Sequence, residues 1–424
     1  MKATAATPAK PPLTDPPDMA LADRYPLFSA IFMECRRDML LSAAGLAFIF
    51  YTIIYVTSLV TAKDFLTIQN AIIGGDFVVF WTAAKSIFTD HLAAIYHPGV
   101  LSVLLDDAFP ARGGFNLTWQ YPPTMFFLIL PLGVLPYLSA HWIWGFATAG
   151  MLAAVIRGFW RNNAALIIAF TSAAAYQGFI TGQTGFLTAA LIAAAAGWAD
   201  RRPMIAGLAA GLLTVKPQLG LLIPFAFAAA GCWRAFTIAA LTGAALAGLS
   251  IVAFGGDVWI AFYEAVTAHG ERLGTDIFPY HKLISPFGGL MVLGAPAAAA
   301  MAVQGIITMS LAAFVFIIWR RVPAWDLRLI ALCSAAALAS PYAFYYELPI
   351  LIPPLLLVAR RGMESGWLRG EKHGLMVLWI APLLLPGNQS LPFASAIAIG
   401  AFAIGARRAM TELTRSATSP APAI

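Results

Sequence analysis

Long apolar segments with almost no charge constrain this chain more than any other feature. The first of them, MLLSAAGLAFIFYTIIYVTSLVTA, covers residues 39–62. A helix of that length is long enough to cross a hydrocarbon core of about 30 Å. In lipid, only helices and closed barrels satisfy every backbone polar group, and a barrel would show alternating segments of about ten residues instead. The sequence therefore predicts an all-α polytopic membrane protein.

The charged residues support this class and exclude another. They make up only 11% of the chain, against about 25% in a soluble domain. The net charge of +6 would suggest nucleic acid as a partner of a soluble protein. Here the basic residues occur as pairs at the ends of apolar runs: Arg36-Arg37, Arg201-Arg202, Arg320-Arg321, Arg360-Arg361 and Arg407-Arg408. Such pairs mark the cytoplasmic side and attract anionic headgroups. We therefore expect membrane lipids, and no nucleic acid, as partners.

The order of the runs predicts a multi-pass protein of the inner (plasma) membrane. Residues 1–38 are expected to form a cytoplasmic leader, partly disordered and with a short interfacial helix, and residues 407–424 a disordered tail. The transmembrane domain, 39–406, should make roughly ten to thirteen crossings, several of them short. If 122–139 were a full span, Arg157 and Arg161 would lie outside, against the charge rule. Either 122–139 is a re-entrant segment, or the positive-inside rule does not hold at Arg157 and Arg161.

The first loop, residues 62–121, should lie on the extracytoplasmic side and contains one prominent acid. GGDFVVFWTAAKSIF (74–88) places Asp76 after two glycines and before apolar residues at helical spacing, with Lys85 elsewhere on the helix. This pattern predicts an amphipathic helix in the membrane interface. Two interpretations of Asp76 remain open. It is an N-cap, or it is a carboxylate held at the membrane surface as a general base.

Two charges inside apolar runs also require an explanation. Lys216 stands beside Pro217, which should break the run 204–230, and Glu347 lies in ASPYAFYYELPILIPPLL (339–356). Such placements are costly in a membrane and are typical of functional sites. Lys216 either extends its ammonium to a helix end or binds an anionic phosphate.

Other polar candidates flank the apolar runs. Gln183 lies between two of them and either bonds across helices or belongs to a site. Tyr121 closes the first loop where aromatic residues are common. The second long polar stretch, 269–289, supplies Arg272, His281 and Lys282.

The sequence has none of the patterns that bind nucleotides or metals. Its six histidines include no HExxH, and there is no phosphate-binding glycine loop and no GxSxG. Its three cysteines lie too far apart to suggest a disulfide framework or a metal site. We therefore expect no metal and no cofactor.

In their order along the chain, several segments carry a resemblance. They are GGDFVVFWTAAKSIF, AAIYHP, FNLTWQYPP, GQTGFLTAALIAAAA, GLLTVKPQLGLL and SPYAFYYELPIL. Over residues 70–355 the chain resembles the polyprenyl-phosphate-dependent membrane glycosyltransferases of family 87, within the GT-C superfamily. The resemblance implies a GT-C-like helix bundle with interfacial helices in the first extracytoplasmic loop.

The resemblance also implies an activity and its residues. A hexose, often mannose, would move from a polyprenyl-phosphate donor to a glycolipid or glycan acceptor, with inversion, on the extracytoplasmic face. Asp76 matches the general base of such enzymes, Lys216 would be a phosphate or structural contact, and His281 a further contact. Arg272, Lys282, Gln183, Tyr121, Lys85 and Glu347 are the remaining substrate-binding candidates.

Two other functions remain as alternatives. In a transporter or lipid-linked sugar flippase, Lys216 and Glu347 would line a translocation path. A ligase or polymerase of surface polysaccharide would share the lipid-linked donor but use another acceptor. The position of the essential acid separates the first alternative from a transferase, since a transporter places it in the middle of the membrane.

Overall fold

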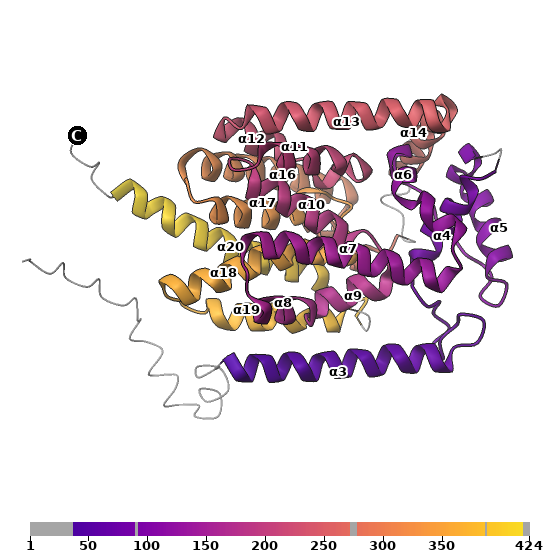
Figure 1. Ribbon diagram of the computed structural model, residues 1–424, viewed down its shortest axis with the longest axis horizontal. Helices are drawn as coiled ribbons and strands as arrows, with labels where there is room; N and C mark the ends of the chain where they lie inside the picture. The colour runs from indigo at the N-terminus through magenta and orange to yellow at the C-terminus, as the bar shows by residue number, and fades with distance from the viewer. Residues whose placement is uncertain (1–36, 90–91, 272–277, 386–387, 419–424) are drawn as a thin grey trace, which may run out of the picture.

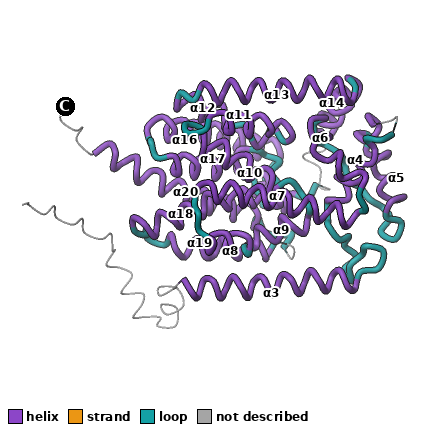
Figure 2. The backbone as a smooth tube through the Cα atoms, in the orientation of Figure 1, coloured by secondary structure: helices purple, strands orange, loops and turns teal. Residues whose placement is uncertain are grey.

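The computed structural model describes residues 37–89, 92–271, 278–385 and 388–418, and over these residues it contains helices and no β-strand (Figures 1 and 2). The predicted all-α polytopic membrane fold is therefore confirmed. Its helices lie mostly along one direction, with a smaller group of helices at one end (Figure 1).

The α-helices are α3 (Arg37–Thr61), α4 (Phe77–Ser86), α5 (Pro98–Ala108), α6 (Phe126–Ile129), α7 (Tyr137–Phe159), α8 (Asn163–Phe170), α9 (Ala173–Thr181), α10 (Gly185–Trp198), α11 (Pro203–Leu212), α12 (Ile223–Ala230), α13 (Trp233–Phe254), α14 (Gly256–Glu271), α15 (Pro286–Val292), α16 (Ala297–Arg321), α17 (Trp325–Ala339), α18 (Ile352–Ser365), α19 (Glu371–Ile380) and α20 (Phe393–Thr418). Short 3₁₀ segments join them: η1 (Leu92–Tyr96), η2 (Pro123–Met125), η3 (Leu130–Val134), η4 (Leu213–Val215), η5 (Pro217–Leu219), η6 (Tyr280–Lys282), η7 (Tyr345–Leu351) and η8 (Ala381–Leu384).

Fewer helices can cross a membrane than the apolar runs suggested. Among the described residues, α3, α7, α13, α16 and α20 are long and apolar enough, and the α8–α9 pair, bent by 60°, would make a sixth. The expectation of roughly ten to thirteen crossings is therefore too high. Proline interrupts two of the other runs, at Pro217, the first residue of η5, and at Pro349 inside η7. Others are short: α10 has 14 residues, which rise only about 21 Å.

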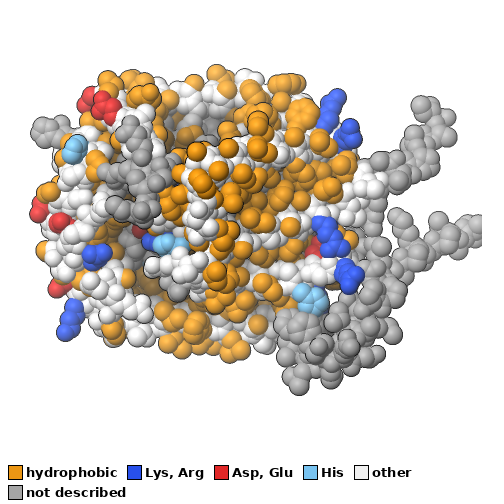
Figure 3. Space-filling model, turned by 180° about the vertical axis from the view of Figure 1, so that it is seen from behind, with side chains coloured by type: hydrophobic (Ala, Val, Ile, Leu, Met, Phe, Trp, Pro, Cys, Tyr) orange, Lys and Arg blue, Asp and Glu red, His pale blue; other side chains and the backbone are white. Residues whose placement is uncertain are grey.

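The segment 122–139 is not a full span, which resolves the conflict with the charge rule. It consists of η2, the four-residue α6 and η3, and α7 then leads back to the end of the bundle where α3 begins (Figure 1). The last residue of α7, Phe159, contacts Trp198 and Trp325 there, with ring centroids 4.9 and 5.3 Å away, and its carbonyl accepts a hydrogen bond from Arg360. Groups of Lys and Arg gather at this end, and an apolar belt separates it from the other (Figure 3).

Helix α4 lies deeper than its sequence pattern predicted. Nine of its ten residues are buried, and the tenth, Lys85, is exposed. The helix packs against α5, α6, α7 and η3, and Trp81 donates a hydrogen bond to the Leu135 carbonyl. The expected exposed polar face is absent from α4, because Thr82 and Ser86, on the side opposite its aromatic residues, are buried as well. Its place in the membrane interface stays a prediction.

The predicted disordered tail, 407–424, is also wrong over its first part. Helix α20 continues to Thr418. Arg408 is buried and forms an ion pair with Glu371 at the start of α19. Its guanidinium also donates a hydrogen bond to the Gly366 carbonyl. This pairing fixes α20 beyond the end of its apolar segment.

We expect Arg408→Ala to lower the free energy of unfolding by about 3–5 kcal/mol, because it leaves the buried Glu371 carboxylate without its counter-charge. Arg407→Ala is the matched control, since Arg407 is exposed, and should change stability by about 0.5 kcal/mol or less. Thermal unfolding of the purified protein in detergent measures both. Equal melting temperatures for the two variants would contradict this role of Arg408.

Candidate active site

Two turns that depend on glycine bring Asp76 and Gln183 together. Gly74 and Gly75 have φ values of +86° and +53°, and Gly182 has +58°, a region that other L-residues rarely adopt. The first turn directly precedes Asp76, and the second directly precedes Gln183. The Gln183 Nε2 donates a hydrogen bond of 3.2 Å to Asp76 Oδ2. Residues 107 positions apart thus share one site.

Asp76 occupies the N-cap position of α4, but its side chain makes no capping hydrogen bond. The carboxylate is turned to Gln183 instead, so the capping interpretation is wrong for the side chain. Burial raises the pKa of Asp76, and the hydrogen bond from Gln183 and the charges of Lys282 and Lys216 only partly oppose this. A helix N-terminus lowers the pKa of a nearby carboxylate, but the effect of burial outweighs it at Asp76. The carboxylate form becomes populated at a higher pH than in an exposed aspartate.

A chain of polar contacts continues from Gln183 into the bundle. The Tyr121 hydroxyl donates a hydrogen bond of 2.8 Å to Gln183 Oε1. The Lys216 ammonium in turn lies 3.3 Å from the Tyr121 hydroxyl. The Tyr96 hydroxyl fixes the backbone of Tyr121 through a hydrogen bond of 2.8 Å to its carbonyl. The first loop, the α9–α10 turn and the break before η5 therefore meet at Tyr121.

The network ends at a buried ion pair between Lys216 and Glu347. Glu347 has no exposed surface, and Lys216 is 5% exposed. Thr184 donates to Glu347 Oε1 at 3.0 Å, and Thr188 donates to Oε2 at 2.6 Å. Both oxygens of the Glu347 carboxylate therefore accept hydrogen bonds, from Thr184, Thr188 and Lys216. A buried carboxylate needs such donors, and here they are present.

Lys216 does not extend to a helix end, because it is buried at a break within the bundle. Its ammonium has three hydrogens, and Glu347, Thr184 at 3.1 Å and Tyr121 at 3.3 Å accept them. The rings of Tyr121 and Tyr346 also lie near it, with centroids 5.2 and 5.0 Å from Nζ. This arrangement leaves no N–H for a phosphate. Of the roles implied by the resemblance, a structural contact fits the geometry.

The second polar stretch brings one cation close to Asp76. Lys282, at the end of η6, is exposed and lies near enough for its charge to act on the pKa of Asp76. The Ile284 N–H donates to the Ala343 carbonyl at 2.8 Å and so fixes this stretch beside η7. Next to Lys282, burial and the charge of that lysine lower the pKa of His281.

Lys85, another predicted residue, does not join the site. Lys85 lies in the last turn of α4, nine positions after Asp76, with its ammonium 4.1 Å from the centroid of the Trp81 ring. Arg272 lies outside the described residues. Gln177 of α9, six positions before Gln183, donates a long hydrogen bond of 3.5 Å to the Pro382 carbonyl instead.

The sequence interpretation missed Thr184, Thr188 and Tyr346. A signal for the threonines was present, since two hydroxyls at positions i and i+4 lie on one face of an otherwise apolar helix. Their partner could not be read from the sequence, because Glu347 lies 159 positions after Thr188.

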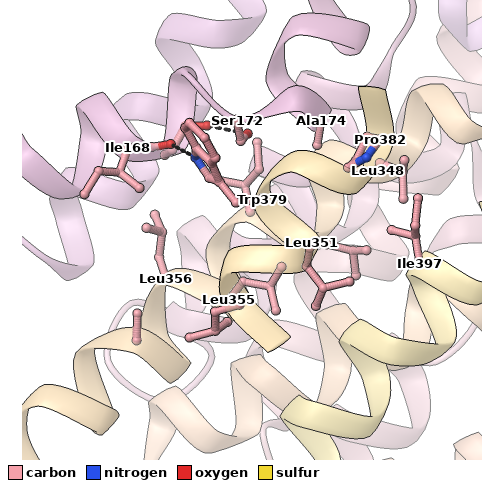
Figure 4. Close-up of a pocket in the computed structure, with 15 residues that line it drawn as sticks. Ile168, Ser172, Ala174, Leu348, Leu351, Leu355, Leu356, Trp379, Pro382 and Ile397 are labelled. Atoms are coloured by element: carbon pink, nitrogen blue, oxygen red, sulfur yellow. Dashed lines mark hydrogen bonds between the residues drawn. The ribbon is translucent and has the colours of Figure 1, made fainter. Parts of the chain in front are cut away.

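An apolar cavity begins one residue after Glu347. Leu348 and Leu351 of η7 line it, together with Trp379 of α19 (Figure 4). Trp379 donates a hydrogen bond of 2.8 Å to the Ile168 carbonyl across the cavity rim. The remaining lining residues come from α8, α9, α18, α19, η8 and α20 and are Ala169, Ser172, Ala174, Ile352, Leu355, Leu356, Ala359, Leu375, Leu378, Pro382 and Ile397. The cavity therefore suits a hydrocarbon ligand.

Fold and site define a multi-pass membrane protein with one carboxylate held in a polar network at the end of its bundle. Residues 119–341 match the family model of glycosyltransferase family 87. Because the match covers more than half of the chain, the protein belongs to glycosyltransferase family 87 and is a glycosyltransferase. The transporter interpretation is thereby set aside. A search of curated proteins and a search of solved structures found no match.

The matched range covers only part of the site. Tyr121, Gln183 and Lys216 lie inside residues 119–341, whereas Asp76 and Glu347 lie outside them. The resemblance over 70–355 is thus confirmed for its central part. The hydrogen bond from Gln183 and the ion pair with Lys216 connect the two outer residues to the matched segment.

We expect Lys216→Met to lower the free energy of unfolding by about 3–5 kcal/mol, because it leaves Glu347 charged and buried without a partner. The double variant Lys216→Met/Glu347→Leu should recover most of this loss, since it removes both charges. Thermal unfolding in detergent measures the cycle, with the exposed Lys85→Met as control. Additive losses in the double variant would show that the pair does not act as a unit.

Proposed function

We propose that the protein transfers a hexose, for which we expect mannose, from a polyprenyl-phosphate donor to a glycolipid or glycan acceptor, with inversion at the anomeric carbon. The observation that carries this proposal is Asp76, a partly exposed carboxylate oriented by Gln183 at one end of the bundle. Membership of glycosyltransferase family 87 supports the transfer of a sugar, and the apolar cavity supports a donor with a lipid chain.

Asp76 is the proposed general base. Its carboxylate takes the proton of an acceptor hydroxyl while that oxygen attacks the anomeric carbon, and the bond from this carbon to the phosphate oxygen breaks. A positioned base of this kind contributes about 10²–10⁴-fold to the rate. The raised pKa of Asp76 brings it closer to the working pH, where a base accepts a proton more readily.

The lipid phosphate gains negative charge as it leaves, and a cation should stabilise it. Lys216 has no free hydrogen for this role, because its three acceptors lie within the protein. Lys282 is exposed and lies near Asp76. We therefore assign the phosphate contact to Lys282, with His281 beside it.

The proposed reaction takes place on the extracytoplasmic face of the inner membrane. Helix α4, which begins directly after Asp76, lies at the end of the bundle opposite the C-terminal ends of α7 and α16 (Figure 1). Arg157 and Arg321 belong to the last turns of those two helices. Lys and Arg at helix ends favour the cytoplasmic side, so the N-terminus would be cytoplasmic. A polyprenyl-phosphate donor supplies the activated sugar itself, so the proposal requires no cofactor and no metal.

We expect Asp76→Asn to lower sugar transfer by about 10²–10⁴-fold while the protein stays folded, because an amide cannot accept the proton. The exposed Asp107 of the same loop offers a matched control, and Asp107→Asn should transfer at the wild-type rate. Transfer from a radiolabelled polyprenyl-phosphate mannose to a membrane glycolipid extract measures both. An Asp76→Asn protein with full activity would rule out this mechanism.

We expect Leu355→Trp to raise the KM for a donor with a long polyprenyl chain several-fold, because the larger ring fills the apolar cavity. A donor with only two isoprene units should be affected less, since it has less chain to place in the cavity. Val377→Trp, at an exposed position of α19, is the control and should leave both values unchanged. An equal change of KM for both donors would place the lipid chain elsewhere.

A further inference from the structure

His141 of α7 is a buried polar side chain that the proposed reaction does not use. Its exposed surface is 0%, and neither ring nitrogen has a hydrogen-bond partner among the described residues. A buried polar group without a partner costs about 1–3 kcal/mol, and an apolar residue would avoid this cost. The position of the imidazole offers a reason for keeping it.

The imidazole lies against both turns that precede Asp76 and Gln183. A methyl group added at Gly74 would lie 2.8 Å from the Tyr137 hydroxyl and 3.2 Å from His141 Nδ1. One added at Gly182 would lie 2.6 Å from Phe77 Cβ and 2.9 Å from the same nitrogen of His141. Both distances to this nitrogen are shorter than ordinary van der Waals contact, so each turn approaches the ring closely because its residue is glycine. His141 Nδ1 of α7 therefore lies close both to the backbone that precedes Asp76 and to the backbone that precedes Gln183.

Neighbouring contacts hold the ring and the turns in place. The ring centroids of Phe77 and Phe179 lie 5.2 and 5.7 Å from that of His141. Four residues earlier on α7, Tyr137 donates a hydrogen bond to the Ile73 carbonyl and so fixes the first turn. A methyl group added at Gly75 would lie 3.3 Å from Thr181 Cα, so the two turns also pack directly against each other.

The shape of the imidazole accounts for its presence in an apolar place. It is the smallest aromatic ring among the side chains. The six-membered ring of phenylalanine would push against Gly74 and Gly182, and a smaller side chain would leave a void beside the two turns and remove the contact that holds them in place. The separation of the turns fixes the distance between the Asp76 carboxylate and the Gln183 amide, which is 3.2 Å.

We propose that His141 is a positioning residue that sets the separation of the Gly74 and Gly182 turns and thereby the hydrogen bond between Gln183 and Asp76. The role of this bond in catalysis rests on the proposed function, in which Asp76 is the base. The bond itself does not depend on that function. His141 touches neither the reacting atoms nor Asp76 in this account, and it acts through the two turns.

The ionisation of Asp76 reports whether the hydrogen bond is present, because the bond stabilises the carboxylate form. Several other groups face Asp76: the cations of Lys282 and Lys216 and the phenols of Tyr137, Tyr345 and Tyr346. Burial raises the pKa of Tyr345 and Tyr346 further above its ordinary value. Both phenols therefore stay neutral in the range where Asp76 titrates.

The test measures this ionisation without a substrate. A lipophilic carbodiimide reacts with protonated carboxyl groups, and mass spectrometry quantifies its product on Asp76 in the full-length protein at a series of pH values. We expect the pH at which half of Asp76 is labelled, the labelling midpoint, to rise by about one pH unit in His141→Ala and in His141→Phe. This corresponds to a tenfold change in the ratio of protonated to ionised Asp76, as expected for a lost hydrogen bond to a charged group.

The decisive comparison uses Gln183→Leu, which removes the hydrogen bond directly. Gln183→Leu should raise the midpoint by the same amount, and His141→Ala added to it should raise it no further. Thr148→Ala is the matched control: Thr148 is buried on α7 and bonds to the Trp144 carbonyl at 2.7 Å, so its loss should leave the midpoint unchanged. An unchanged midpoint in His141→Ala, or an equal additional rise in the Gln183→Leu background, would overturn the proposal.

The same variants separate this inference from the proposed function. If Asp76 is the base, the acid limb of the pH profile for sugar transfer should move together with the labelling midpoint. A wild-type protein that transfers no sugar would contradict the proposed function, whereas the labelling result for His141 would stand. If His141→Phe does not fold, His141→Ala and His141→Asn provide the same comparison.

Discussion

The buried ion pair between Lys216 and Glu347 is the interaction on which the rest of the site depends. It joins the break between α11 and α12 to η7, and Thr184 and Thr188 attach both partners to α10. Two charges removed from water are costly unless every donor and acceptor is satisfied. Here Lys216 has three acceptors and Glu347 three donors. Through Tyr121 and Gln183, the same contacts extend to Asp76 and fix its surroundings.

A membrane protein can hold such a pair only where other segments enclose it. Irregular backbone at membrane depth is tolerated when protein covers it, and the 3₁₀ segments η4, η5 and η7 provide the breaks that carry Lys216 and Glu347. Helix α10 is buried along nearly its whole length and packs against α7, α11, α17 and η7. Short helices and broken runs are thus the structural means by which polar residues converge inside an apolar bundle.

The sequence predicted the parts of this structure that depend on local pattern. The apolar runs gave the membrane class and the position of α3, and Pro217 gave the break beside Lys216. Asp76 and Gln183 were recognised as unusual, but not as partners. The depth of α4, the pKa of Asp76 and the pairing of Lys216 with Glu347, 131 positions away, depend on tertiary contacts, and no local pattern encodes these. His141 was missed because its significance lies in two glycines distant in sequence.

The position of Asp76 at the end of the bundle away from the arginine pairs determines on which side of the membrane it exchanges its proton. If the arginine end faces the cytoplasm, as we propose, Asp76 would exchange its proton with extracytoplasmic water. The proton released by each transfer would then leave on that side. Because burial raises the pKa of Asp76, acidification of the cell's surroundings would slow the proposed reaction, whereas a change of cytoplasmic pH would not reach its base. The proposed reaction would then respond to the outer environment.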